Sequence, residues 1–159
     1  MFSESFLSVS STPSDGVALI PARSEALLSA CLAVRSAVFT KEYGIPQTME
    51  RDAADALGTG CEHFLVRLNG QDAGALRCVF PSPGVVRLQR FCILSDLRGH
   101  GIGRAVLAAL EEFYHDQAGQ FELDAKFRVE GFYLACGYRT VSDVFMEAGV
   151  PHVKMIKKL

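Results

Sequence analysis

Apolar and polar positions along the first sixty residues predict one strand and one helix. Residues 17–20 are a short apolar run typical of a strand. Apolar residues between positions 26 and 38 recur at steps of three and four, which indicates an amphipathic helix, with Ser24 as its N-cap. The Tyr-Gly-Ile-Pro sequence at 43–46 ends this helix. Residues 47–60 form a polar, acidic connection with one helical turn at most.

A hairpin and a helix follow. Asn69-Gly70 separates apolar runs over 63–68 and 71–80, and Asn-Gly readily adopts the two left-handed conformations of a type I′ turn. Residues 85–93 predict a third long strand. The next helix has the clearest apolar face of the chain, formed by Ile102, Ala105, Val106, Ala109, Leu110 and Phe113.

The remaining pattern predicts a strand at 121–125 and a helix near 128–136, with Gly137 as its left-handed cap. Strands over 138–145 and 152–158 close the chain. A strand–helix–strand unit between hairpins requires a mixed, partly parallel sheet with helices packed on it. The fold class is therefore α/β, with α+β as the neighbouring description.

Composition indicates a soluble protein of one domain. The chain has 159 residues, 49% hydrophobic and 21% charged, which is a globular average, and residues 17–159 are expected to form a single domain. A net charge of −2 excludes a globally basic nucleic-acid clamp. The apolar runs are too short to span a bilayer, so we expect neither a membrane nor a nucleic-acid partner.

Cysteine usage and the N-terminal segment indicate a reducing compartment. The five cysteines have no paired spacing, which argues against a disulfide framework and against a zinc site: Cys31, Cys61, Cys78, Cys92 and Cys136. Residues 1–16 are rich in serine and lack the basic and apolar regions of a signal peptide. We expect a partly ordered tail over 1–16, a cytoplasmic location and no bound metal.

A glycine-rich turn between the third strand and the second helix carries the strongest chemical signal. Arg98-Gly99-His100-Gly101-Ile102-Gly103-Arg104 brings successive backbone N–H groups and the positive end of a helix dipole to one place, which favours a phosphate or pyrophosphate ligand. A Walker A loop would need Gly-Lys-Ser/Thr here, and a dinucleotide fingerprint would need Gly-x-Gly-x-x-Gly. Neither spacing is present.

The turn resembles the pyrophosphate loop of the GNAT superfamily of acyl-CoA N-acyltransferases. That loop reads Arg/Gln-x-x-Gly-x-Gly/Ala, which Arg98, Gly101 and Gly103 match. A second family pattern, aromatic-Tyr-x-x-x-Gly-aromatic, is met by residues 132–138. Further features resemble the bacterial ElaA/YjcF-like branch: Arg35-Ser36-Ala37-Val38-Phe39, Glu42, Gly44-Ile45-Pro46, Asp52, His63 and Glu147-Ala148-Gly149-Val150-Pro151-His152.

The resemblance implies a fold and a function. It implies a mixed, mostly antiparallel sheet of about six to seven strands with helices on both faces. It also implies an N-acetyltransferase that moves an acetyl group from acetyl-CoA to a primary amine of a small molecule or protein. The amine would attack the thioester directly in a ternary complex. The alternative is a catalytically weak acyl-CoA sensor or interaction module on the same fold, and a homodimer stays open.

The resemblance also implies which residues contact the donor. Backbone N–H groups of the glycine turn would hold the pyrophosphate, and the end of the third strand would pair with the pantetheine arm and supply an oxyanion donor at Phe91 or Cys92. Lys126 and Arg128 would reach CoA phosphates or be solvated surface residues. The predicted donor-site residues are Phe91, Cys92, Ile93, Arg98, Gly99, His100, Gly101, Ile102, Gly103, Arg104, Lys126 and Arg128.

Catalysis needs an acid for the leaving thiolate and a base for the amine. Tyr133 is implied as the acid, because a phenol is protonated at neutral pH and can give its proton to a thiolate. For the base, His63 and His152 titrate nearest the working pH, Glu147 is a further candidate, and a water relay stays open.

Three residues are predicted to bind the acceptor: Arg90, Arg77 and Glu42. A guanidinium in the acceptor site would favour a substrate with a carboxylate or phosphate. The alternative for each arginine is an ion pair with a nearby acid, such as Glu42 or Asp52 for Arg90.

Overall fold

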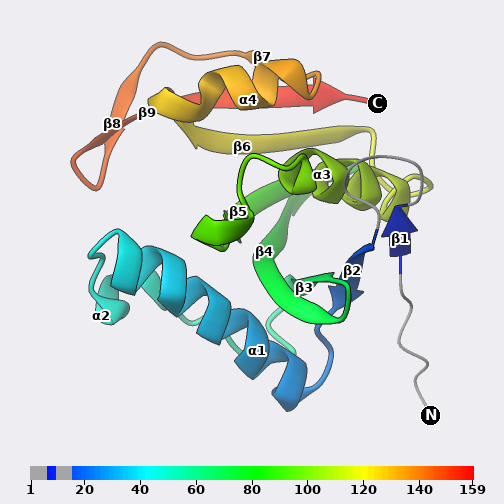
Figure 1. The fold of residues 1–159 in the computed structure, drawn as a ribbon. Helices are drawn as coiled ribbons and strands as arrows, with labels where there is room; N and C mark the ends of the chain where they lie inside the picture. Colours follow the sequence, from blue (N-terminus) through cyan, green and yellow to red (C-terminus); the bar gives the residue numbers. More distant parts are fainter. Residues whose placement is uncertain (1–6, 10–15) are drawn as a thin grey trace. The chain divides into compact units, whose positions relative to one another are not determined.

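Antiparallel strands begin the fold in the computed structural model, which describes residues 7–9 and 16–159 (Figure 1). The chain divides into two compact units, which are described in turn. The first comprises Met1–Cys78 and Arg90–Phe113, and the second comprises Val79–Gln89 and Tyr114–Leu159. The predicted tail over 1–16 lies outside the described residues except for residues 7–9 and 16.

The first unit contains a sheet in the order β1-β2-β3-β4-β5. The first three strand pairs are antiparallel. Asn69 and Gly70 connect β3 to β4 with φ values of 50° and 81°, as the type I′ turn predicted from Asn-Gly requires. The strand bounds are β1 Leu7–Val9, β2 Val17–Pro21, β3 Glu62–Leu68, β4 Gln71–Ser82 and β5 Val85–Ile93, the last two crossing into the second unit.

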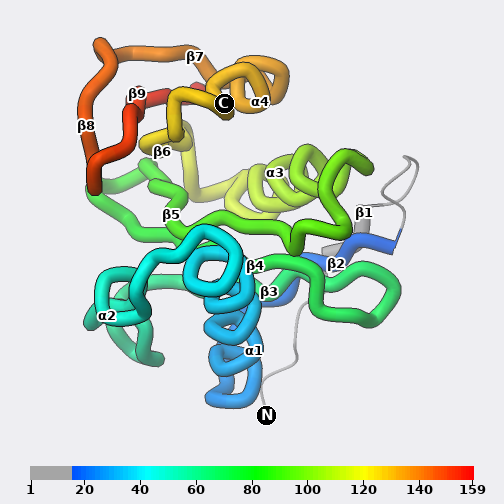
Figure 2. Tube along the Cα trace, turned by 60° about the vertical axis from the view of Figure 1, so that its left-hand side comes forward, coloured from blue at the N-terminus to red at the C-terminus, as the bar shows by residue number. Residues whose placement is uncertain are grey.

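Helices cover both faces of this sheet (Figure 2). Successive side chains of a strand point to opposite faces, so Phe64 and Leu65 of β3 enter different cores. Leu65 packs in the core that contains Val34 of α1 (Glu25–Arg35). Phe64 packs edge-on against Phe113 of α3 (Ile102–Phe113), with ring centroids 5.2 Å apart. The prediction of helices on both faces of a sheet is confirmed in this unit.

The first helix changes its geometry after its last α-helical turn. Its N-cap is Ser24, as predicted, whose Oγ accepts a hydrogen bond from the amide of Leu27 at 3.2 Å. The expected helix to Val38 continues instead as a π-helix, η1 (Ser36–Glu42), and a single helical turn, α2 (Gln47–Glu50), follows. π-Helical segments are rare and concentrate at functional sites, because the wider turn changes the direction in which side chains leave the helix.

The second unit is built on β9 and β6. The start of β5 pairs in parallel with the start of β6: Val85–Arg87 lie opposite Gln120–Glu122. Two parallel strands need a crossover connection between them, and α3 is part of the connection here. β6 (Gln120–Lys126) pairs antiparallel with β9 (Val150–Lys158), and β9 also pairs with β7 (Arg139–Thr140) and β8 (Phe145–Glu147).

The helix predicted near 128–136 is a 3₁₀ turn, η3 (Phe127–Val129), followed by α4 (Glu130–Ala135). Gly137 follows it with φ of 93°, which confirms the predicted left-handed cap. Within the described residues, no helix is long and apolar enough to cross a membrane.

The predicted strand over 138–145 is wrong. The strand pairing with β9 covers Arg139–Thr140 and resumes at Phe145, with one further backbone bond from the amide of Val141 to the carbonyl of Lys154 at 2.8 Å. Between these stretches the hydroxyl of Ser142 accepts a hydrogen bond from the backbone N–H of Lys154 at 2.8 Å. A side chain therefore occupies the donor that would bond to a backbone carbonyl if the strand continued. Nine strands are present in the described chain, and the shortest of them, β1, β7 and β8, have three residues or fewer.

We expect Gly74→Ala to destabilise the protein by about 1–3 kcal/mol, because overpacking against backbone forces strands apart. A Cβ at Gly74 on β4 would lie 2.5 Å from the carbonyl oxygen of Cys92 on β5 and 2.7 Å from Ile93 Cδ1. Urea unfolding measures the loss. Gly119→Ala is the control, because its Cβ would meet nothing within 4 Å. Equal stability of the two variants would contradict this account of the close approach.

Candidate functional site

The glycine turn presents open backbone at the amino end of α3. It follows a 3₁₀ turn, η2 (Ser95–Leu97), and Gly99 and Gly101 have φ values of 83° and 79°. A Cβ at either glycine would meet nothing within 4 Å. The helical ladder starts with the amide of Ala105 donating to the carbonyl of Gly101 at 3.1 Å, so the amides of the first turn face the loop. An anionic group such as a phosphate fits this arrangement.

The side chain of Arg98 fixes this turn to the preceding elements. Its Nη1 and Nη2 donate to the two carboxylate oxygens of Glu42 at 2.6 and 2.7 Å, and its Nε donates to the carbonyl of Ile93 at 2.9 Å. The guanidinium also lies 5.6 Å from the ring centroid of Tyr43. The Glu42 carboxylate raises the pKa of Arg98. Arg98 therefore joins the turn to η1 and leaves the backbone amides to contact a ligand.

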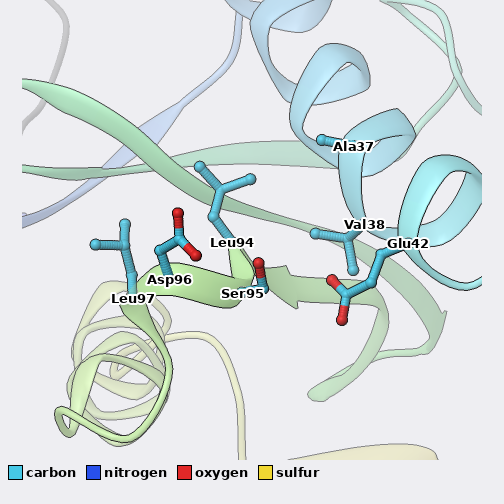
Figure 3. A pocket seen from close by; sticks show the side chains of 7 residues that line it. All are labelled: Ala37, Val38, Glu42, Leu94, Ser95, Asp96 and Leu97. Atoms are coloured by element: carbon cyan, nitrogen blue, oxygen red, sulfur yellow. The ribbon is translucent and has the colours of Figure 1, made fainter.

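A pocket of about 340 Å³ lies beside this ion pair. Figure 3 shows the carboxylate of Glu42 extending from η1 toward Ser95, the first residue of η2. The pocket is lined by Ala37, Val38, Glu42, Leu94, Ser95, Asp96 and Leu97. The π-helical geometry of η1 thus places Glu42 where it contacts both the pocket and Arg98.

A buried ionic cluster lies under α2, and Arg35 is at its centre. The Arg35 side chain is 1% exposed, and its Nε and Nη1 donate to Glu50 Oε1 and Asp55 Oδ1, each at 2.6 Å. Burial lowers the pKa of Arg35, but the hydrogen bonds that Arg35 donates to Asp55 and Glu50 outweigh it and raise the pKa overall. The pKa of Asp55 is well below its ordinary value, because Arg35 outweighs the opposite effect of burial. The Arg35–Asp55 pair therefore stays charged at neutral pH.

Arg77 extends the cluster across the sheet. It is buried on β4 and donates to Asp52 Oδ1 at 2.7 Å and to Asp55 Oδ1 at 3.0 Å, which is the ion pair that the sequence left as its second alternative. The pKa of Asp52 is lowered, chiefly by this hydrogen bond. His63 lies opposite Arg77 in the register of β3 and β4; it is also buried, and its Nε2 lies 2.9 Å from the carbonyl of Ala54.

Arg90 lies at the rim of the same cluster. Its φ of 55° is a left-handed conformation within β5. Its Nε donates to the carbonyl of Glu50 at 3.1 Å, and its Nη2 is 3.6 Å from Asp52 Oδ2. Burial lowers the pKa of Arg90, and the charges of Arg77 and Arg35 lower it further. Glu42, the third predicted acceptor residue, is paired with Arg98 instead of with either arginine.

The end of β5 presents its amides to alternate sides. The amide of Leu94 donates to the carbonyl of Ala73 on β4 at 2.9 Å. Amides two residues apart in a strand point the same way, so Cys92 also faces β4, whereas Phe91 and Ile93 face away from it. Cys92 is buried, and burial raises the pKa of its thiol to about 12.

In the second unit, α4 places Tyr133 between two aromatic rings. Its ring meets those of Phe132 and Tyr138 edge-on, with centroids 5.0 and 5.7 Å away. Burial raises the pKa of its phenol above the ordinary 10.0, so the hydroxyl carries its proton throughout the neutral range.

His152 and Glu147 meet in the hairpin of β8 and β9. His152 Nε2 lies 3.4 Å from Glu147 Oε2, and its Nδ1 lies 2.7 Å from the carbonyl of Val150. The imidazole stacks on Phe145 at 6.0 Å. Lys126 is at the end of β6, and burial, with the charge of Arg128 second, lowers its pKa.

Sequence reasoning missed four members of the ionic cluster: Arg35 as a buried charge, Glu50, Asp55, and Arg51, whose Nε lies 3.4 Å from Glu50 Oε2. The sequence offered one sign of this cluster: the charged residue Arg35 directly follows Val34, an apolar position of the predicted helix. No spacing in the sequence names its partners, which are 15 and 20 residues away. Within residues 7–9 and 16–159, no group of three or more His, Cys, Asp or Glu side chains could hold a metal ion.

Comparison with known proteins gives one consistent result. The acetyltransferase (GNAT) domain family matches residues 20–159. The uncharacterised N-acetyltransferase YjcF of Bacillus subtilis is 35% identical over 138 residues, which are 86% of this chain and 96% of YjcF. The crystal structure of a proposed N-acetyltransferase from Lactobacillus plantarum is 32% identical in sequence, with a TM-score of 0.83. The match covers 91% of this chain and 99% of that protein's chain. The structure of Escherichia coli ElaA is 26% identical in sequence, with a TM-score of 0.74, and the match covers 89% of this chain and 99% of ElaA.

We expect the free energy of unfolding to fall as the pH is lowered below about 4. The folded-state pKa values of Asp52 and Asp55 lie below their ordinary 3.8, so their contribution is present above that value and is lost as the pH falls through the folded pKa. Urea unfolding between pH 6 and pH 2.5 measures this. Asp52→Asn should weaken the pH dependence, whereas Asp72→Asn, in an exposed pair with Arg67, should leave it unchanged. Equal slopes for both variants would show that the cluster is not the cause.

Proposed function

The chain belongs to the acetyltransferase (GNAT) family and is an acyl-CoA-dependent N-acyltransferase, and on this premise we propose that it moves an acetyl group from acetyl-CoA to a primary amine by direct attack in a ternary complex. The observation that carries the proposal is the glycine turn, whose open backbone at Gly99 and Gly101 lies at the amino end of α3. The amine is that of a small molecule or of a protein.

The donor site in the first unit follows from this turn. Backbone amides from Arg98 to Arg104 hold the pyrophosphate, because they form a cradle that carries partial positive charge. The bound donor supplies a thioester, which is an activated acyl group. Amides of the β5 edge that face away from β4, those of Phe91 and Ile93, pair with the pantetheine arm. In the second unit, Lys126 and Arg128 contribute positive charge for the phosphates.

The same edge supplies the oxyanion donor. Sequence reasoning named Phe91 or Cys92, and the direction of the amides favours Phe91, because Cys92 turns toward β4 with Leu94. A preorganised amide stabilises charge on the thioester oxygen as the amine attacks. The high pKa of the buried Cys92 thiol supports direct attack, because a protonated thiol is a poor nucleophile.

Tyr133 serves as the general acid for the departing thiolate. Its raised pKa keeps the phenol protonated, which is the form that can donate. For the base, His152 is favoured over His63 because the carboxylate of Glu147 lies 3.4 Å from His152 Nε2, whereas the partner of His63 Nε2 is the backbone carbonyl of Ala54. A water relay remains the alternative to His152.

Further expectations complete the proposal. Residues 17–159 act as one domain and residues 1–16 as its tail, in the cytoplasm, with no metal, nucleic acid or membrane as a partner. A homodimer stays open, because the described chain contains nothing that assigns a dimer interface. An acyl-CoA sensor without turnover is the competing function, and the Tyr133 variant below distinguishes it from the enzyme.

Glu42→Gln should weaken acetyl-CoA binding about three- to tenfold. Without the carboxylate, Arg98 loses two charge-assisted hydrogen bonds and the turn is held less firmly. Isothermal titration measures the dissociation constant. Glu62→Gln is the control, since it breaks another exposed arginine–glutamate pair, with Arg23, away from the turn. If Glu42→Gln binds as tightly as Glu62→Gln does, Arg98 does not need Glu42.

Tyr133→Phe should lower kcat about a hundredfold or more and leave the dissociation constant for acetyl-CoA unchanged, because general acids contribute about 10²–10⁴ to a rate. Thiol release with an amine panel measures the rate. Tyr138→Phe is the control, since it removes the hydroxyl of a neighbouring ring. Unchanged turnover would remove Tyr133 from the mechanism, and tight binding without turnover in the unaltered protein would favour the sensor.

A further inference from the structure

We propose that Arg90 forms a carboxylate-binding subsite, so that the acceptor is an amine that carries a carboxylate close to its amino group. This inference rests on the proposed function, because it names the class of acceptor for the same reaction. It is carried by the charges of the ionic cluster, by the hydrogen bonds that Arg90 lacks, and by its position in β5.

The cluster contains one more guanidinium than carboxylate. Its carboxylates are Glu50, Asp52 and Asp55, and its guanidiniums are Arg35, Arg51, Arg77 and Arg90. Arg51 belongs to it through Glu50, whose Oε2 is 3.4 Å from Arg51 Nε. One positive charge therefore remains without a matching carboxylate among the described residues of the cluster, and it lies in partly desolvated surroundings, where an added anion would be attracted strongly.

Within the described residues, Arg51 and Arg90 are the two arginines of the cluster that donate no hydrogen bond to a carboxylate, and their positions select Arg90 as the anion site. Arg51 Nη2 donates to the carbonyl of Leu32 on α1 at 3.1 Å, whereas Arg90 lies on β5 directly before Phe91. Arg35 donates to both oxygens of Asp55 and to Glu50, and Arg77 donates to both oxygens of Asp52 and to Asp55. Arg90 instead makes one hydrogen bond, from Nε to the backbone of Glu50. Its contact with Asp52, at 3.6 Å, is longer than a hydrogen bond.

The guanidinium of Arg90 is also accessible. Its side chain is 30% exposed, whereas those of Arg35 and Arg77 are 1% and 3% exposed. The Nη1 and Nη2 groups thus present a planar pair of donors that matches the two oxygens of a carboxylate. A single excess charge suits a carboxylate better than a phosphate, which carries nearly two negative charges.

The position of Arg90 explains why the anion would belong to the acceptor. Arg90 directly precedes Phe91, the proposed oxyanion donor, and consecutive Cα atoms are only about 3.8 Å apart. An anion bound at the Arg90 guanidinium therefore lies about one arginine side chain away from the backbone of the oxyanion donor, which suits an amine whose carboxylate is a few bonds from its nitrogen. The left-handed conformation of Arg90 is uncommon for a residue other than glycine, and such conformations concentrate at functional sites.

Matched acceptors test the inference. Glycine and glycinamide, β-alanine and β-alaninamide, and phenylalanine and phenylalaninamide differ only in the carboxylate, and thiol release from acetyl-CoA gives kcat/KM for each. The readout is the ratio of kcat/KM for the acid to that for its amide. We expect Arg90→Gln to lower this ratio at least tenfold for the accepted pairs, and Arg90→Lys to retain part of it, because the ammonium keeps the charge without the planar fork.

A control variant and a stability measurement make the result specific. Arg67→Gln removes an arginine from an exposed pair with Asp72 on β3 and β4 and should leave the ratio unchanged. Thermal melting of each variant shows whether it is folded. If the acid-to-amide ratio is the same in Arg90→Gln and the unaltered protein, or if only amines without a carboxylate are acetylated, the inference is wrong and the proposed function stands. If no amine at all releases thiol from acetyl-CoA, the proposed function fails as well.

Discussion

The buried guanidinium of Arg35 is the constraint on which the first unit depends. A charged group that is 1% exposed must be paired, because removing one partner of a buried ion pair costs about 3–5 kcal/mol. Its partners, Glu50 and Asp55, belong to a segment whose regular structure is the four residues of α2. Ion pairs therefore hold residues 50–55 against α1, β4 and β5 where secondary structure does not. The positions of Asp52 and Arg90 follow from this arrangement.

The glycine turn uses the same kind of interaction for a different purpose. Arg98 is bonded to Glu42 and to the backbone of Ile93, and so its side chain holds the turn in place. The backbone of Gly99 and Gly101 is left open at the amino end of α3. The π-helix η1 connects the two sites, because it begins directly after Arg35 and ends at Glu42. A change in η1 would therefore affect both the ionic cluster and the turn.

Local signals in the sequence predicted the features that depend on neighbouring residues. Asn69-Gly70, the glycine turn and the cap at Gly137 were predicted correctly, because each depends on backbone conformations that glycine and asparagine favour. The resemblance to the ElaA/YjcF-like branch of the GNAT superfamily is confirmed by the family match and by the relatives.

Features that depend on distant residues were not predicted. Arg77 has its partners 25 and 22 positions earlier in the chain, and both alternatives for this residue fitted the sequence equally well. The π-helix has the same apolar period as the helix it extends. The break between β7 and β8 depends on a bond between Ser142 and Lys154 that no local pattern reveals. The partners of Arg77 and of Ser142 lie 12 or more positions away along the chain, beyond the reach of a local pattern.

The most direct test of the central claim is calorimetric titration of the protein with acetyl-CoA, with NAD and ATP as controls. The account predicts a dissociation constant of about 1 μM for acetyl-CoA, which corresponds to about −8 kcal/mol, and much weaker binding of the two controls. Absence of binding to acetyl-CoA, or equal binding of all three ligands, would contradict the assignment of the glycine turn as the donor site, and the proposed acetyl transfer would fail with it.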